Sequence, residues 1–73
     1  MATQIVMDYT GDTRHSFDEK DANAVLRAED RFKELIRVGF TAAVRTPYGE
    51  VSVTRAFDPT AEETLFFPRL VGG

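Results

Sequence analysis

Residues 18–39 read DEKDANAVLRAEDRFKELIRVG, and this stretch decides the fold class. Apolar side chains recur in it at spacings of three and four, which is the pattern of a single amphipathic helix. The apolar stripe consists of Val25, Ala28, Phe32, Leu35 and Ile36. Asp18 is a suitable N-cap, and Gly39 suits the left-handed conformation that ends many helices. We therefore expect one helix inside this stretch, with its stripe covered by another layer.

The residues before the helix alternate between apolar and polar side chains. The alternating positions are Ile5, Met7 and Tyr9 in the first run and His15 and Phe17 in the second. Alternation at every second residue is typical of a strand with one buried face. Residues 10–12, Thr-Gly-Asp, form a turn signal between the two runs. The chain is therefore predicted to open with a β-hairpin.

Alternation returns after the helix. Its apolar positions are Phe40, Ala42 and Val44 in one run and Val51, Val53 and Phe57 in the next. Between these runs, residues 46–49 place Pro at the second position and Gly at the fourth position of a turn, which favours a hairpin. A last β-rich run over residues 64–67 stops at Pro68, whose missing N–H cannot extend a ladder.

The predicted element order is β-β-α-β-β-β, which indicates an α+β fold. A helix with one apolar stripe must lie across one face of a mixed sheet. A hairpin, a helix and then further strands is the order of a β-grasp, or ubiquitin-like, roll. We expect this domain to occupy residues 1–68, followed by a flexible C-terminal tail over residues 69–73.

The composition limits the classes of function. The chain has 73 residues and no cysteine, so one domain forms without disulfides or thiolate metal sites. Its apolar content of 42 % argues against disorder, and its formal net charge of -3, mixed in sign, gives no reason to expect nucleic acid. Neither a signal peptide nor a membrane span is recognisable, so a cytoplasmic location is expected. A domain this small has little room for an active-site pocket, so we expect chemistry done to the chain and not by it.

The tail offers a place for that chemistry. It reads Arg69-Leu70-Val71-Gly72-Gly73, after the run that Pro68 ends. Two glycines contribute no side chains to a core. A Gly-Gly carboxylate can enter a narrow channel, lie against ATP and present an unhindered carbonyl carbon to a nucleophile.

Residues 62–73, EETLFFPRLVGG, resemble the C-terminus of the molybdopterin synthase small subunit and of the related thiamine sulfur carrier. Those proteins end in an acidic turn, an apolar strand, a Phe-Pro-Pro-like step and Gly-Gly. The resemblance implies that an E1-like enzyme adenylates Gly73, with Gly72 as steric clearance beside it. The ATP belongs to that partner, and the chain itself needs no cofactor. The resemblance also implies a contact surface for the activating enzyme, made of Phe66, Phe67, Arg69, Leu70 and Val71.

The resemblance leaves two outcomes open after activation. Arg69 stands where the sulfur carriers usually have a second proline, and an arginine there is closer to ubiquitin. The acylated glycine then becomes either a thiocarboxylate that delivers sulfur or a thioester passed to an isopeptide bond, with a sulfur-transfer or E2-like partner. A function of another class is a non-covalent adaptor that uses the same fold without tail chemistry.

A stand-alone enzyme is the least favoured interpretation. His15 is the only histidine, and no cysteine or second histidine completes a catalytic or metal site. We interpret His15 as a structural residue and Asp58, beside Pro59, as a turn residue.

Overall fold

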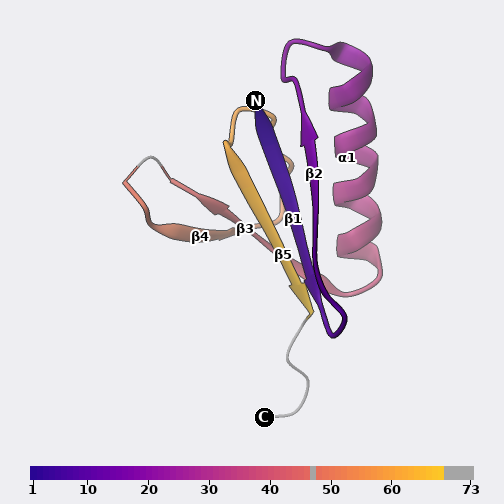
Figure 1. Cartoon of the computed structure of the whole chain (residues 1–73), viewed down its shortest axis with the longest axis vertical. Helices are drawn as coiled ribbons and strands as arrows, with labels where there is room; N and C mark the ends of the chain where they lie inside the picture. Colours follow the sequence, from indigo (N-terminus) through magenta and orange to yellow (C-terminus); the bar gives the residue numbers. More distant parts are fainter. Residues whose placement is uncertain (47, 69–73) are drawn as a thin grey trace.

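The computed structural model describes residues 1–46 and 48–68, drawn in Figure 1. The elements are β1 (Ala2–Asp8), β2 (Gly11–Phe17), α1 (Ala22–Arg37), β3 (Phe40–Arg45), β4 (Val51–Thr54) and β5 (Glu63–Pro68). This order confirms the predicted β-β-α-β-β-β sequence of elements. No helix in the described ranges combines the length and the apolar character needed to cross a membrane.

The strands form one mixed sheet in the order β2-β1-β5-β3-β4. The last strand, β5, is therefore the central one. It runs parallel to β1 on one side and antiparallel to β3 on the other. The helix packs against one face of this sheet, as the single apolar stripe requires.

The helix begins three residues later than the N-cap prediction implied. Asp21 is the N-cap, and its Oδ1 accepts hydrogen bonds from the backbone N–H groups of Asn23 (3.0 Å) and Ala24 (3.2 Å). Asp18 instead accepts from the backbone N–H of Lys20 at 2.9 Å, in the turn before the helix. The prediction of Asp18 was wrong because both aspartates suit a cap, and only the local turn decides between them.

The end of the helix agrees with the prediction. Gly39 has φ of +106°, and its N–H donates to the carbonyl of Ile36 at 3.1 Å. A residue with a Cβ is strained at this φ, so glycine suits the position. This turn brings the chain directly into β3.

Aromatic rings dominate the core under the helix. Phe32 packs against Phe66 with ring centroids 5.5 Å apart at an interplanar angle of 71°. Phe57 packs against Phe32 at 5.8 Å and against Phe17 at 6.3 Å. Phe57 was expected to continue the strand β4, but it lies in the connector beyond that strand. Its ring nevertheless links the two ends of the core.

The buried face of β1 is the opposite of the predicted one. Ala2 and Val6 pack in the core under the helix, and Gln4 between them is 0 % exposed. The Nε2 of Gln4 donates to the carbonyl of Ala28 at 3.0 Å, and its Oε1 accepts from Arg31 at 2.8 Å. A buried amide with both ends bonded is tolerated in a core. Because the buried Gln4 is polar, the alternation of apolar and polar residues in the sequence did not indicate this buried face of β1.

The predicted apolar positions of β1 have different surroundings. Ile5 is buried on the helix-free face of the sheet, and Met7 on that face is half-buried. Tyr9 follows the strand and is almost fully exposed. The hairpin is therefore confirmed, and so is the shared side of His15 and Phe17 in β2, which faces the helix. In β1 the predicted apolar positions lie on the helix-free face, and of these Ile5 is buried.

Candidate functional site: the end of β5 and the helix-free face

Two of the predicted site residues, Phe66 and Phe67, lie in the described part of β5. The others, Arg69, Leu70, Val71, Gly72 and Gly73, lie outside the described residues.

Three chain segments meet where β5 ends. Pro68 pairs with Phe40 at the start of β3. Because β1 runs parallel to β5, its last residue, Asp8, lies at the same end of the sheet. Figure 1 shows β5 ending close to the turn that joins β1 and β2. Pro68 therefore lies between this turn and the helix-to-β3 connection.

Phe66 does not belong to a contact surface. It is 0 % exposed, and its ring packs edge-on against Phe32 on the helix side of the sheet. A side chain in the core cannot reach a partner without local unfolding. The expectation that Phe66 contacts an activating enzyme is therefore corrected.

Phe67 faces the other way, because successive side chains of a strand point to opposite faces. It pairs with Thr41 and is half-buried. Leu65, two residues earlier, lies on the same face and pairs with both Ile5 and Ala43.

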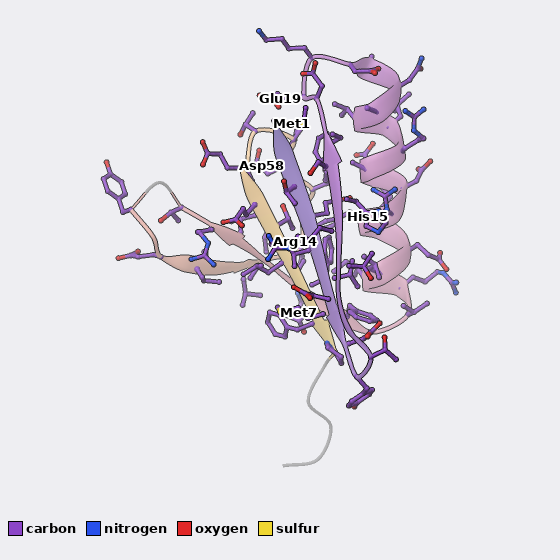
Figure 2. The ribbon with its side chains drawn as sticks, in the orientation of Figure 1. Met1, Met7, Arg14, His15, Glu19 and Asp58 are labelled. Carbon is purple, nitrogen blue, oxygen red and sulfur yellow. The ribbon has the colours of Figure 1, made fainter. Side chains whose placement is uncertain are left out.

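The helix-free face thus carries an apolar surface over three strands. We call it the outer patch; it consists of Ile5, Met7, Ala43, Leu65 and Phe67. Ile5 and Ala43 are buried by their neighbours, whereas Met7, Leu65 and Phe67 are half-buried and reach the surface. Figure 2 shows Met7 near the end of β1 that lies next to the end of β5. The accessible part of the outer patch therefore adjoins the point where the tail departs.

Charged side chains lie around the outer patch. Arg45 and Glu63 form an ion pair with Nε to Oε1 at 2.8 Å, and Arg14 lies 3.8 Å from Asp12. All four are at least one-third exposed, so these pairs contribute little to stability. Their main effect is on the orientation of an approaching partner.

The turn beside the end of β5 carries a fixed negative charge. Asp8 accepts hydrogen bonds from the Oγ1 of Thr10 at 2.6 Å and from its backbone N–H at 2.8 Å. These bonds, first the one from the hydroxyl group, lower the pKa of Asp8 below its usual value. A carboxylate is therefore held in a defined position at the same end of the sheet as Pro68.

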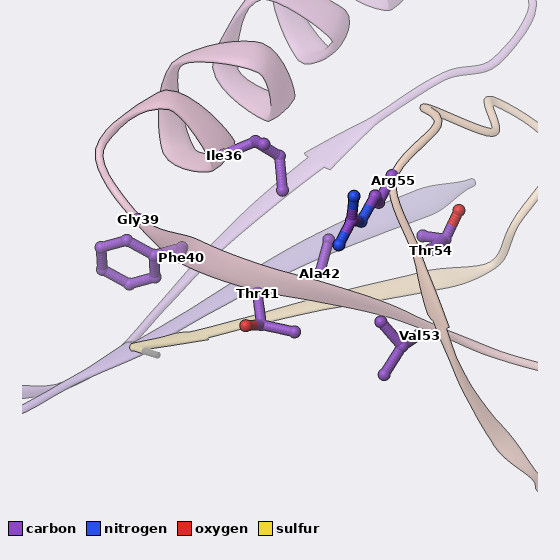
Figure 3. Close-up of a pocket in the computed structure, with 8 residues that line it drawn as sticks. All are labelled: Ile36, Gly39, Phe40, Thr41, Ala42, Val53, Thr54 and Arg55. Carbon is purple, nitrogen blue, oxygen red and sulfur yellow. The ribbon is translucent and has the colours of Figure 1, made fainter. Parts of the chain in front are cut away.

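A hollow lies beside this end of the sheet, between the end of α1 and the strands β3 and β4 (Figure 3). Its volume is about 400 Å³, and it is lined by Ile36, Gly39, Phe40, Thr41, Ala42, Val53, Thr54 and Arg55. These side chains offer apolar contact, two hydroxyl groups and one guanidinium group. They include no carboxylate or imidazole that could act as a general base.

His15 is placed as a structural residue would be. It is half-buried on the helix side of β2, where burial, and secondly the charge of Arg31, lowers its pKa. Within residues 1–46 and 48–68, no three His, Cys, Asp or Glu side chains are grouped to hold a metal ion.

Comparison of the chain with protein families, curated proteins and solved structures gave no match. Function is therefore inferred from the residues and their arrangement. The sequence-based prediction missed Met7 and Leu65 as surface residues of the candidate site. Alternation within β5 contained the signal for Leu65, because it must share a face with Phe67 and not with Phe66.

Proposed function

We propose that this chain is a ubiquitin-like modifier or sulfur carrier whose Gly73 is activated by an E1-like enzyme. One observation carries the proposal: the central strand β5 ends at the rim of the sheet, and Arg-Leu-Val-Gly-Gly follows it in the sequence. Five residues can reach at most about 17 Å when extended.

The arrangement of the helix and strands supports the proposal. One helix packs on a five-stranded mixed sheet, with the first and last strands parallel at its centre. This arrangement is consistent with a β-grasp. Since one fold hosts many functions, the tail and its surroundings carry the functional argument.

The chemistry requires nothing of this chain except a free carboxylate. A carboxylate oxygen of Gly73 attacks the α-phosphorus of ATP, and pyrophosphate leaves. A sulfur nucleophile supplied by the partner then attacks the acyl carbon, and AMP leaves. The product is a thiocarboxylate or a thioester, and a lysine amine that attacks the thioester gives an isopeptide. The missing side chains at Gly72 and Gly73 leave the acyl carbon open to each attack.

The activating enzyme is proposed to bind the outer patch. Met7, Leu65 and Phe67 supply apolar contact next to the departing tail. Phe66 acts only through the fold, because its ring lies in the core.

Pyrophosphate exchange tests the proposal directly. The chain is incubated with the E1-like enzyme of its host, ATP and labelled pyrophosphate, and label should enter ATP. Deletion of Gly73 should abolish the exchange, whereas Lys33→Ala on the exposed helix face should not. Exchange that survives the deletion, or no exchange with the intact chain, contradicts the proposal.

Intact-mass measurement of the protein from its host separates the two outcomes. It first establishes whether Gly73 carries the free carboxyl group. Replacement of one oxygen by sulfur then indicates sulfur delivery, whereas covalent adducts with other proteins indicate conjugation.

A non-covalent adaptor is the second candidate, and the outer patch favours it independently of the tail. It predicts that loss of Gly72 and Gly73 leaves partner binding intact, whereas Leu65→Lys abolishes it. A modifier or carrier, in contrast, requires both the Gly72-Gly73 end and the outer patch.

A further inference from the structure

The outer edge of β4 is the most exposed apolar strand edge in the described part of the protein. β4 lies at one end of the sheet and pairs with β3 alone. Its sequence is Val-Ser-Val-Thr, without a charged residue, and Val51 and Val53 are 52 % and 67 % exposed. An uncharged edge of this kind is a template for pairing with another strand.

The turn before β4 fixes which backbone groups face that edge. The N–H of Thr46 donates to the carbonyl of Glu50 at 2.7 Å, so these two residues form a hydrogen-bonded pair. In an antiparallel ladder such pairs alternate with non-hydrogen-bonded pairs. The pairs Arg45–Val51 and Ala43–Val53 are therefore non-hydrogen-bonded. It follows that the N–H and C=O groups of Val51 and Val53 point away from β3, to the free edge.

We propose that this edge pairs with β4 of a second copy of the chain, in antiparallel direction about a two-fold axis. Placing Val51 opposite Val53 of the second copy uses every outward group of both valines. The register gives four backbone hydrogen bonds, two in each of two equivalent pairs. Shifting it by two residues in either direction pairs a valine with itself and leaves the other valine without this partner.

The side chains agree with that register. Val51 and Val53 lie on the helix-free face, since Val53 pairs with Ala43 of the outer patch. Each valine would therefore lie beside a valine of the second copy, which is a favourable cross-strand pair. The outer patches of the two copies would become one continuous apolar surface.

The charges at the ends of β4 are complementary in the same register. Glu50 precedes the strand and Arg55 follows it, both exposed. Neither forms an ion pair with another residue in the ranges 1–46 and 48–68. In this register Glu50 of each copy lies opposite Thr54 of the other, one residue from Arg55, so one acidic and one basic side chain lie at each end of the paired strands. Opposite charges at both ends therefore favour a second copy over a strand of unrelated sequence.

The arrangement of the elements leaves room for the pairing. In Figure 1 the β3–β4 hairpin extends away from the rest of the molecule, and α1 lies on the far side from β4. A two-fold axis perpendicular to the sheet places both helices on the same face with the paired edges between them. Four hydrogen bonds and two valine pairs make a small interface, so the dimer is weak. We expect a dissociation constant between about 10 µM and about 1 mM.

Sedimentation equilibrium of the full chain, from about 20 µM to about 1 mM, tests the inference. The mean mass should rise from monomer toward dimer. Val53→Lys should keep the chain monomeric, because it places two ammonium groups at the paired edge. Val53→Pro should do the same by removing an outward N–H that the ladder with β3 does not use. Circular dichroism checks that each variant is folded.

Val38→Lys is the matched control, since Val38 is a similarly exposed valine, at 55 %, at the end of the helix. It should associate as the unaltered chain does. A monomeric unaltered chain over the whole range overturns the inference, as does a folded Val53→Lys variant that still dimerises. Loss of dimer in Val38→Lys alone places the interface elsewhere and also overturns it. The test does not involve the tail, so it stands or falls separately from the proposed function.

Discussion

Phe66 and Phe67 are neighbours of the same residue type, yet the two faces of the sheet give them different tasks. Phe66 lies in the core against Phe32, whereas Phe67 lies half-buried on the helix-free face beside the end of β5. One ring holds the helix on the sheet, and the other is available to a partner. The comparison teaches that an apolar residue type alone does not show whether a side chain of β5 lies under the helix; the face of the strand on which it lies decides this.

The largest effect should come from the helix side. Phe66→Ala removes a fully buried ring and should lower the free energy of unfolding by about 3–5 kcal/mol. A domain of this size has only about 4–11 kcal/mol in total, so urea denaturation should show a severely weakened fold. Phe66→Leu keeps most of the volume and should lose far less. A mild effect of the alanine variant would mean that the two faces are not divided as described.

The buried amide of Gln4 should give the next largest effect. Gln4→Ala removes the bonds to the carbonyl of Ala28 and to Arg31, and should cost about 1–3 kcal/mol. Combining it with Arg31→Ala in a double-mutant cycle isolates the link between them. Strictly additive losses would show that this side-chain bond does not contribute.

Phe67→Ala should change stability by only about 1 kcal/mol, because the ring is half-buried. If the outer patch binds the activating enzyme, the same variant should raise the KM for the chain in pyrophosphate exchange. Phe66→Leu, in contrast, should leave the KM in pyrophosphate exchange unchanged as long as the protein is folded. Equal behaviour of the two variants in both measurements would remove the distinction between the faces.

The smallest effect should be a pH dependence at His15. Its pKa is lowered from 6.5 by burial, so the unfolded chain binds a proton more readily than the folded chain. The contribution of His15 to stability is present above the unfolded pKa of 6.5 and is lost as the pH falls from 6.5 through the lower folded pKa. Urea denaturation between about pH 7.5 and about pH 5.5 should therefore show a decline that His15→Gln reduces.

Asp8 and Asp58 titrate in a lower pH window than His15 and do not obscure this test. Asp8 and Asp58 have pKa values below 3.8, each chiefly through a hydrogen bond from a threonine hydroxyl two residues on. Their contribution is present above the unfolded value and is lost as the pH falls through the lower folded value. A decline between pH 7.5 and 5.5 that is the same in His15→Gln would contradict the assignment to His15.

The sequence predicted the elements better than it predicted their faces. The stripe in residues 18–39 and the turn at Gly49 were sufficient for the helix and the second hairpin, because spacing and turn chemistry are local. The face of β1 could not be predicted, since the buried side chain is the polar Gln4 and its partners come from the helix. Nor could residue type alone separate Phe66 from Phe67.

For the candidate site, the resemblance of residues 62–73 indicated the end of β5, and the structure adds the surface beside it. Met7 reaches that surface only because β1 runs parallel to β5, a long-range relation that no local pattern contains. The role of residues 69–73 in activation is a proposal, and the pyrophosphate-exchange experiment tests it.

The central position of β5 also affects how the protein folds. The two hairpins, β1–β2 and β3–β4, share no ladder with one another and are joined within the sheet only through β5, which follows both in the chain. The sheet therefore cannot close during synthesis until residues 63–68 have left the ribosome, and until then both hairpins expose unpaired inner edges. Closure of the sheet is consequently a late step that depends on β5.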